Sequence, residues 1–214
     1  MKESKENAVI SRATVDRLPL YFRTLKLSQE EGLEIISSDE LGRKIGVTPE
    51  QIRKDLSAFG EFGKKGVGYY VQELMRNIGE ILGLNRNWNL AIVGVGHMGW
   101  ALANYSNFSS QGFQIRAIFD IDDDKIGRYI NEVEIFHIDS MKEIIQKCDI
   151  QIGIITVPVA YAQDMANCLV EAGVKGIWNF APMKINVPAN IYVVSEDLSI
   201  GLSSISYYLS RQNS

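Results

Sequence analysis

The amino-acid sequence predicts an α/β protein with two parts, a small helical domain followed by a doubly wound parallel sheet. Up to about residue 84, short capped helices precede a segment rich in glycine and aromatic residues. Beyond it, strand-like apolar segments alternate with helical ones, the pattern of a parallel sheet with right-handed crossovers. The 214 residues, 46% hydrophobic and 22% charged, are typical of a globular protein with a packed core.

The composition argues against several other classes of protein. No apolar run approaches the roughly 18 residues that span a bilayer, and residues 1–10 lack the apolar stretch of a secretory signal. We therefore expect a cytoplasmic protein without a membrane partner. Cys148 and Cys168 fall in expected helices without metal-ligand spacing, so we interpret them as buried free thiols and expect no metal site.

The first domain is expected to begin with a helix over about residues 13–26, because Leu18, Phe22 and Leu25 lie at helical spacing. Pro19 is expected to be tolerated only near the first turn of this helix. A capping box at residues 37–40 then opens a short helix that Gly46 ends.

A second capped helix follows at once. Thr48 and Pro49 supply its N-cap and first-turn proline. Its buried side is expected to carry Ile52, Leu56 and Phe59, with Gly60 as its end. Two capped helices separated by about three residues predict a helix-turn-helix.

The outward face of this second helix carries Arg53, Lys54 and Ser57, besides Glu50. Cations and a hydroxyl suit contacts with phosphates and base edges, although a solvated helix face has the same composition. The net charge of −4 argues against nucleic acid, yet residues 43–65 hold six basic and three acidic side chains. A phosphate backbone responds to such a local patch.

The stretch EFGKKGVGYY, residues 61–70, predicts a tight hairpin wing that carries Lys64 and Lys65. A wing beside a recognition helix favours DNA binding over a solvated face. Residues 1–84 are therefore predicted to form a winged helix DNA-binding domain, with DNA contacts from Arg53, Lys54, Ser57, Lys64 and Lys65. An amphipathic helix over 71–82 closes it, and the polar string 85–87 marks the boundary.

The second domain, residues 85–195, alternates strands and helices. Strands are expected near residues 89–94, 113–119, 133–137, 150–155, 176–180 and 191–194, and helices near 97–107, 140–147, 159–172 and 197–210.

The stretch AIVGVGHMGW, residues 91–100, combines the end of a strand with the glycine spacing that holds a dinucleotide pyrophosphate. The expected cofactor contacts are Gly94, Val95, Gly96, His97, Met98 and Gly99. The next strand ends in Asp120, 21 residues after Gly99, where a carboxylate accepts hydrogen bonds from ribose hydroxyls. Ile121 follows, and residues 122–124 add negative charge that disfavours a 2′-phosphate. The sequence predicts a Rossmann-like fold that binds NAD or NADH.

Two further strand ends carry small and apolar residues, and these are expected to form a dry pocket for the nicotinamide ring. They are Thr156, Val157, Pro158, Asn179, Phe180 and Ala181. No general acid stands out near them, so we expect no catalytic residue, with Tyr105 and Lys184 left open. The cofactor is therefore expected to be sensed rather than consumed.

These motifs together resemble one known family. The stretches IRKDLSAFGEFGKKGVGY, IVGVGHMG, TVP and WNFAP closely resemble the Rex family of bacterial redox-sensing transcriptional repressors, over about residues 11–210. The resemblance implies a homodimer that binds palindromic double-stranded operator DNA when NAD⁺ prevails and releases it when NADH binds. It also implies that residues 196–214 form a helix swapped onto the partner, packed between its two domains.

The resemblance extends to individual residues. It implies recognition-helix and wing roles for the four cations named above, and NAD contacts for the three motif glycines and Asp120. It further implies an interdomain switch made of Arg23, Tyr105 and Asp197. One position departs, because some members place a swapped phenylalanine near the nicotinamide where this chain has Leu198.

Three functions remain open at this point. The first is an NADH-responsive DNA-binding repressor. The second is an NAD-dependent oxidoreductase whose N-terminal domain only oligomerises. The third is a non-catalytic module for an acyl-coenzyme A-type ligand with a protein-binding winged helix. The four cations favour the first, the missing acid/base disfavours the second, and Asp120 disfavours the third.

Overall fold

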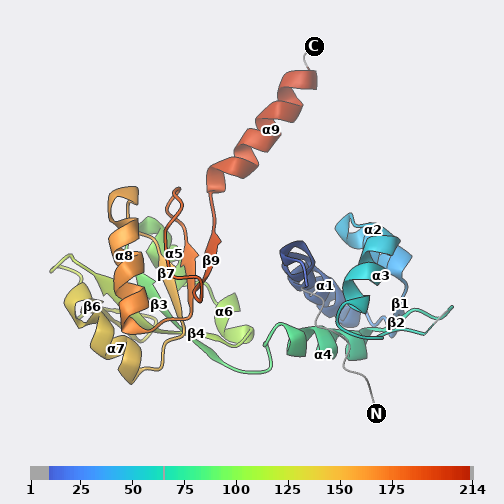
Figure 1. Cartoon of the computed structure of the whole chain (residues 1–214), viewed down its shortest axis with the longest axis horizontal. Coiled ribbons are helices and arrows are strands. Elements are labelled where there is room, and N and C mark those ends of the chain that lie inside the picture. The colour runs from blue at the N-terminus through green and yellow to red at the C-terminus, as the bar shows by residue number, and fades with distance from the viewer. Residues whose placement is uncertain (1–9, 65, 213–214) are drawn as a thin grey trace. The chain divides into compact units, whose positions relative to one another are not determined.

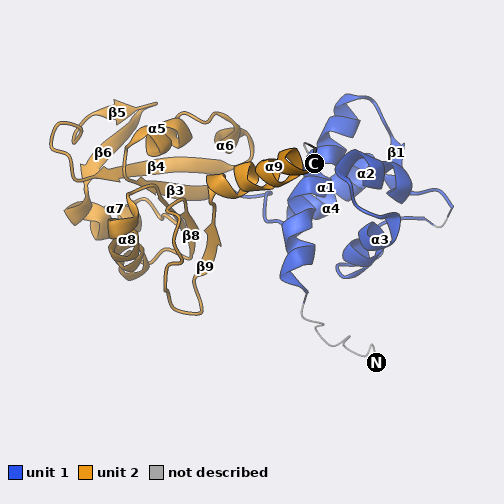
Figure 2. Ribbon diagram, turned by 90° about the horizontal axis from the view of Figure 1, so that it is seen from above, with its two compact units in different colours: residues 1–86 blue, residues 87–214 orange. Residues whose placement is uncertain are grey.

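The computed structural model describes residues 10–64 and 66–212, which divide into two compact units, residues 1–86 and 87–214 (Figures 1 and 2). The division falls within the polar string 85–87. Each unit has its own apolar core. Lys65, one of the expected wing cations, lies outside the described residues.

The first unit is a helical domain closed by a two-stranded sheet. Its elements are α1 (Arg12–Glu30), β1 (Ile35–Ile36), α2 (Ser38–Ile45), α3 (Pro49–Ser57), β2 (Tyr69–Tyr70) and α4 (Val71–Ile81). β1 and β2 pair antiparallel. The core gathers buried apolar side chains of α1, α2, α3 and α4 around Ile36 and Tyr69 of the strands.

The expected helix caps are confirmed. The Ser37 hydroxyl accepts the Glu40 N–H at 3.0 Å and opens α2, and the Thr48 hydroxyl accepts the Gln51 N–H at 3.3 Å and opens α3. Gly46 ends α2 in the left-handed region, with φ of 72°. The turn is tight, because a Cβ on Gly42 would lie 2.3 Å from the Val47 carbonyl oxygen. These local features fix the helix-turn-helix.

Two expectations about helix ends are wrong. Pro19 lies inside α1 rather than near its first turn. Its ring lacks the N–H that would bond the Val15 carbonyl, but both residues are exposed, so water can replace that bond. The second error concerns α3, which ends at Ser57, so Phe59 follows the helix and is only half-buried.

A buried carboxylate joins α1 to α3. Asp55 of α3 is 1% exposed and accepts five side-chain hydrogen bonds. Arg17 of α1 donates two, at 2.6 and 2.8 Å, and the Tyr21 hydroxyl donates one at 2.6 Å. Thr14 donates at 3.1 Å and Gln51 at 2.7 Å. Burial alone raises the pKa of Asp55, but hydrogen bonds from Arg17, Tyr21 and Gln51 outweigh it and lower the pKa to about 2.

The second unit is a seven-stranded sheet in the order β5-β6-β4-β3-β7-β8-β9, parallel except at β5. Its strands are β3 (Trp88–Val93), β4 (Phe113–Asp120), β5 (Tyr129–Ile130), β6 (Val133–His137), β7 (Ile152–Ile155), β8 (Gly176–Asn179) and β9 (Tyr192–Ser195). Its helices are α5 (His97–Ala103), α6 (Asn107–Ser110), η1 (Ile138–Ser140), α7 (Met141–Lys147), α8 (Val159–Ala172) and α9 (Leu198–Gln212). This confirms the predicted doubly wound sheet.

Helices cover both faces of the sheet, with α5 and α6 on one side and α7 and α8 on the other (Figure 2). Alternating side chains of β3 explain this arrangement. Ala91 and Val93 belong to the cluster that includes α7 and α8, whereas Leu90 and Ile92 belong to the cluster that α5 covers. A strand buried on both faces is expected to have a near-continuous run of apolar residues, and residues 90–93 of β3 form such a run.

The cysteine expectation is corrected in part. Both thiols are free, but neither is buried, since Cys148 is half-buried just after α7 and Cys168 is exposed on α8. The apolar residues that face the sheet from α8 include Ala162, Ala166 and Leu169, which leaves Cys168 on the outer side. Among the described residues, no helix is long and apolar enough to cross a membrane.

We predict that Asp55 makes the stability of the first unit pH-dependent. Its folded-state pKa of about 2 lies below the ordinary 3.8, so it contributes about 2 kcal/mol of stability above pH ~4 that is lost as the pH falls through ~2. Urea denaturation of Asp55→Asn should therefore show a large loss in unfolding free energy at neutral pH and a smaller loss near pH 2.5.

The matched control is Asp16→Asn, which removes an exposed carboxylate of α1. Its effect on the unfolding free energy should be small at both pH values. A loss for Asp55→Asn that stays constant down to pH ~2.5 would contradict the assigned pKa.

Candidate functional site

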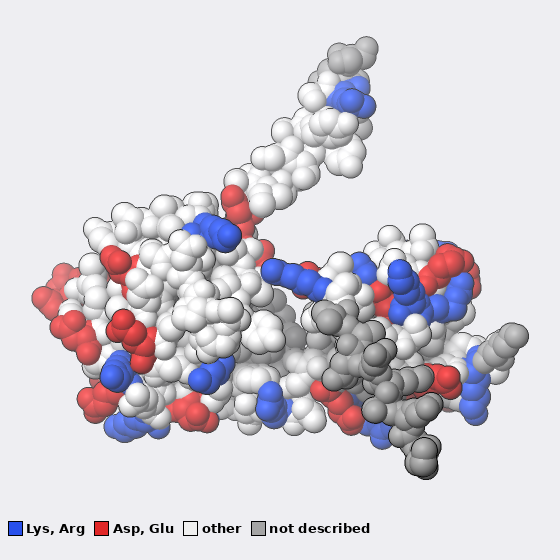
Figure 3. Space-filling view, in the orientation of Figure 1, with Lys and Arg blue, Asp and Glu red and all other residues white. Residues whose placement is uncertain are grey.

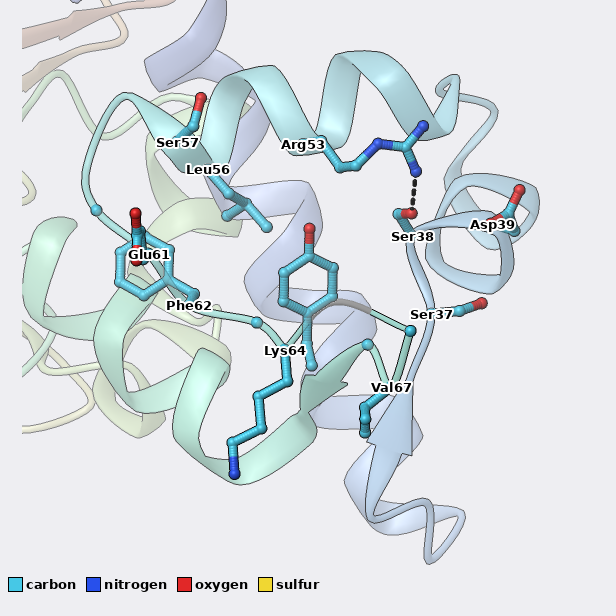
Figure 4. Close-up of a pocket in the computed structure, with 15 residues that line it drawn as sticks. Ser37, Ser38, Asp39, Arg53, Leu56, Ser57, Glu61, Phe62, Lys64 and Val67 are labelled. Atoms are coloured by element: carbon cyan, nitrogen blue, oxygen red, sulfur yellow. Dashed lines mark hydrogen bonds between the residues drawn. The ribbon is translucent and has the colours of Figure 1, made fainter.

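A groove of about 590 Å³ runs between α3 and the glycine-rich segment that follows it (Figure 4). Its walls come from residues 37–39 at the start of α2, from side chains of α3, and from residues 60–64 and 66–69. The glycine-rich segment is a tight turn, in which the Lys64 N–H donates to the Gly68 carbonyl at 3.0 Å and the Gly68 N–H donates back at 3.1 Å. Gly68 has φ of 107°, and a Cβ there would lie 2.7 Å from the Ile36 carbonyl oxygen of β1. The predicted wing is thus a short hairpin held against β1.

Cations line this groove. Arg53 of α3 donates to the Ser38 hydroxyl at 2.6 Å and to the Glu50 carboxylate at 3.0 Å. Lys54 and Ser57 are exposed on the same helix. Lys64 extends from the wing, with its ammonium 5.5 Å from the centre of the Tyr70 ring. Arg53 and Lys64 are themselves exposed, although the Ser38 partner of Arg53 is buried. Exposed cations of this kind can exchange a surface partner for a phosphate or a base edge.

The glycine motif follows β3, and each of its three glycines has a different surrounding. Gly94 has φ of 94°, and a Cβ there would lie 2.7 Å from a methyl carbon of Val157. A Cβ on Gly99 would lie 2.0 Å from the Gly94 carbonyl oxygen, so this glycine lets α5 pack closely on the loop. A Cβ on Gly96 would meet nothing within 4 Å. The backbone around Gly96 therefore faces an open space, as a loop that cradles a pyrophosphate requires.

Asp120, at the end of β4, holds this loop in place. It is 8% exposed. Its Oδ2 accepts the Val95 N–H at 2.6 Å, and its Oδ1 accepts the N–H groups of Ile121 and Asp122 at 2.8 and 3.0 Å. Burial raises the pKa of Asp120, but these backbone hydrogen bonds outweigh it and hold the pKa below the ordinary value.

The sequence reasoning missed Lys125. Its ammonium lies 3.4 Å from Asp120 and 3.2 Å from Asp122. Burial lowers the pKa of Lys125, but the two carboxylates outweigh this and raise it. The acidic turn at residues 120–124 is therefore partly neutralised, less negative than its composition indicates. A cation five residues after a strand-end aspartate is the sequence signal that could have indicated this ion pair.

The remaining predicted pocket residues lie at the same edge of the sheet, because the carboxyl ends of parallel strands meet there. The Thr156 hydroxyl, just after β7, contacts the carbonyls of Val93 and Gly94 at 3.0 and 2.7 Å. Asn179, at the end of β8, is fully buried, and its side chain is bonded to the backbone of Ala181 and Met183. Both polar side chains thus shape their loops. Phe180 is half-buried beside them, Ala181 is buried, and Pro158 caps α8.

The three predicted switch residues are exposed. Arg23 lies on α1 in the first unit. Tyr105 follows α5 and its hydroxyl accepts a hydrogen bond from Asn107 at 3.1 Å. Asp197 accepts the N–H and hydroxyl of Ser199, and these hydrogen bonds lower its pKa. Within the described part of the chain, no hydrogen bond joins Tyr105 to Asp197, so the network stays a prediction. The described residues also hold no cluster of three metal-ligating side chains.

Comparisons with known proteins cover both units. Residues 9–57 match the family model described as the N-terminus of a putative DNA-binding protein, and residues 85–183 match the model of a CoA binding domain. The redox-sensing transcriptional repressor Rex of Syntrophobacter fumaroxidans is 48% identical over 95% of this chain and 97% of its own length. The Rex repressor of Carboxydothermus hydrogenoformans is 47% identical over 94% and 97%. The chain belongs to the Rex family.

Solved structures agree with this membership. A Rex-family repressor, RSP, in complex with NAD⁺ and operator DNA, is 41% identical with a TM-score of 0.91, over 96% of this chain and 95% of that one. RSP in complex with NADH gives a TM-score of 0.89 at 39% identity, over 96% and 97%. The curated Rex relatives are named repressors and not enzymes, which confirms the predicted lack of catalysis. The match to the CoA-binding model reflects the Rossmann-like fold that the Rex family shares with it.

We predict that Asp120 stabilises the second unit even without a cofactor. Asp120→Ala leaves the Val95 N–H without its acceptor, so the free energy of unfolding should fall by roughly 1–3 kcal/mol. Chemical denaturation without added nucleotide measures this loss.

The control for this experiment is Asp123→Ala, which removes the same charge from an exposed position of the same turn. It should change the unfolding free energy little. Equal losses in the two variants would show that charge, and not the bond to Val95, is what matters.

Proposed function

We propose that this protein is a redox-sensing transcriptional repressor that binds operator DNA through α3 and the wing and releases it when NADH occupies the glycine-motif site. Its membership of the Rex family, in which RSP has been crystallised with NAD⁺ and operator DNA and with NADH, carries this proposal. We place the protein in the cytoplasm, where NADH and DNA are both present.

The DNA contacts of this proposal come from the groove of the first unit. Arg53, Lys54 and Ser57 project from α3 toward base edges in the major groove. Lys64 and Lys65 of the wing bind phosphates or the narrow groove. The exposure of Arg53, Lys54, Ser57 and Lys64 supports these roles. A palindromic operator fits a homodimer, because two-fold symmetry in the protein demands the same symmetry in the DNA.

The cofactor contacts come from the carboxyl edge of the sheet. The backbone of residues 94–99 cradles the pyrophosphate over the open side of Gly96. Asp120 and Ile121 hold the adenosine ribose, and the carboxylate disfavours the 2′-phosphate of NADP(H). Lys125 offsets part of that charge, so the preference for NAD(H) depends on the Asp120 acceptor atoms as well as on repulsion.

The nicotinamide ring lies in the pocket formed by residues 156–158 and 179–181. This pocket offers apolar atoms and buried backbone rather than a counter-ion. The oxidised ring carries a positive charge and the reduced ring is neutral, so desolvation favours NADH in such a pocket. The difference in desolvation cost would let the protein distinguish NADH from NAD⁺ without catalysing a reaction.

We assign the coupling between NADH binding and DNA binding to α9 together with Arg23, Tyr105 and Asp197. Residues 198–211 are all exposed, among them seven large apolar side chains, and Figure 3 shows the helix almost free of charge. Surface of this kind is expected to pack against a protein. We assign it to the partner subunit of a homodimer, between that subunit's two domains, which brings Asp197 to Arg23 and Tyr105. Leu198 there supplies burial without ring stacking.

We predict that NADH releases the operator and that NAD⁺ and NADPH do not. A fluorescent duplex enriched from random double-stranded DNA by the protein with NAD⁺ serves as the probe, and anisotropy gives the affinity. NADH should weaken binding by at least about tenfold, within the usual range of allosteric coupling. Failure to enrich any sequence, or equal affinity with NADH and NAD⁺, would overturn the proposed function.

Single cations should contribute in two distinct ways. Arg53→Ala should cost about 1–3 kcal/mol on the enriched duplex and relax its sequence preference. Lys64→Ala should weaken binding to all duplexes and lower the slope of log affinity against log salt by about one unit. Lys26→Ala, an exposed cation of α1, is the control and should change neither quantity. An unchanged salt slope in Lys64→Ala would remove the wing from the interface.

A further inference from the structure

Four aromatic rings of the second unit form a continuous chain of contacts. Phe180, in the proposed nicotinamide pocket, contacts Trp178 with ring centres 4.5 Å apart. Trp178 meets the edge of Phe108 of α6 at 6.1 Å, and Phe108 meets the edge of Tyr105 at 5.0 Å. The chain therefore begins at the pocket and ends at an exposed tyrosine.

The position of each ring follows from the fold. Trp178 and Phe180 are two residues apart along and just beyond β8, so both face the side of the sheet that α5 and α6 cover. Phe108 and Tyr105 belong to one turn, because the Phe108 N–H donates to the Tyr105 carbonyl at 3.2 Å. Phe108 and Trp178 are half-buried and Tyr105 is 51% exposed. Trp178 packs against the apolar cluster that includes Val95 of the glycine-motif loop. Neither Phe108 nor Trp178 has been given a role in what has been proposed so far.

The contacts Trp178–Phe108 and Phe108–Tyr105 are edge-to-face and that of Phe180 with Trp178 is tilted. Such contacts restrict the orientation of both rings in each pair. A nicotinamide ring against Phe180 would change the orientations open to Phe180, and then those of its neighbours along the chain. Tyr105 is also tied to the phosphate loop through α5, which begins at His97 and ends two residues before it. The tyrosine is thus positioned from both halves of the cofactor site.

We infer that Phe108 and Trp178 are positioning residues that transmit occupancy of the nicotinamide pocket from Phe180 to Tyr105. This inference rests on the proposed function, in which Tyr105 takes part in the switch. A ligand moves an equilibrium only through its differential affinity for the two states, and in this inference the ring contacts are the ones that would differ in geometry between them.

The test compares Phe108→Leu with the unaltered protein in the operator-binding experiment. Leucine keeps an apolar side chain on α6 but removes the ring, so NADH affinity and DNA affinity without NADH should stay within about twofold, well inside the effect expected from coupling. The ratio of operator affinities without and with NADH should fall at least about fivefold. Phe108→Tyr keeps the aromatic ring, so its ratio of operator affinities without and with NADH should equal that of the unaltered protein. Phe108→Met replaces the leucine variant if that variant does not fold.

Phe113→Leu is the matched control. Phe113 packs against the apolar cluster that also holds Trp178 and Phe180, but within the described chain it makes no ring contact with the four residues of the ring chain. It should lower thermal stability as much as Phe108→Leu and leave the NADH effect unchanged. A merely structural role for Phe108 would make the two variants alike.

A spectroscopic measurement separates the inference from the proposed function. In protein labelled with 3-fluorotyrosine, the ¹⁹F resonance of Tyr105, assigned with Tyr105→Phe, should shift on NADH binding. The shift should persist in Phe113→Leu and vanish in Phe108→Leu. If NADH releases DNA from the unaltered protein and from Phe108→Leu equally, the ring chain is overturned and the proposed function stands. If NADH releases DNA from neither, the proposed function fails first.

Discussion

The bond between the Val95 N–H and the Asp120 carboxylate is the contact on which the second unit's site depends. It joins the loop after β3 to the end of β4 at 2.6 Å, in a place where both groups are buried. Gly94, which has a positive φ, directly precedes Val95, and Gly99 packs closely on the same loop. A buried N–H without a partner costs more than the bond itself contributes. The loop is therefore organised before any nucleotide arrives.

The first unit uses a buried carboxylate in the same way. Asp55 lies on the inner side of α3, and its partners on α1 fix the rotation of the helix whose outer side carries Arg53 and Lys54. A purely apolar contact would stabilise α3 as well, but polar bonds restrict its geometry more narrowly. In both units an aspartate whose residue type suggests ligand binding or a surface position instead holds a functional element in place through buried hydrogen bonds. These residues are Asp55 and Asp120.

Local signals explain why most of the fold could be predicted. The caps at Ser37 and Thr48, the turn at Gly46 and the apolar strand segments are read from neighbours in the sequence, and all are confirmed. The errors arose where tertiary contacts decide. Pro19 is held inside α1 by the buried face around it, and β5 exists only because it pairs with β6.

For the candidate site, the residue types at the strand ends were predictable from the sequence. That the side chains of Asn179 and Thr156 form hydrogen bonds with the backbone was not. Lys125 and the ring chain were missed because a side chain's partner across the fold leaves no mark in the local pattern.

In the proposed sensor, NADH binding in the second unit has to affect DNA binding by α3 in the first unit. The exposed apolar surface of α9 is our candidate for the element that couples them. A monomer with α9 wholly exposed would leave Ile200, Leu202 and Ile205 in water, at a cost of roughly 1.5–3 kcal/mol for each such side chain that could be buried. In the homodimer that we propose, packing against a second copy would remove that cost and place two DNA-binding units under one symmetry. The proposed packing would also couple the arrangement of the units to any change in the surface that it covers. Tyr105 is exposed, adjoins α5 and ends the aromatic chain from the pocket. Under our proposal, a reorientation of the Tyr105 ring on NADH binding alters the interface between two copies rather than one chain alone. A small local difference between NADH and NAD⁺ then changes the spacing of the two recognition helices.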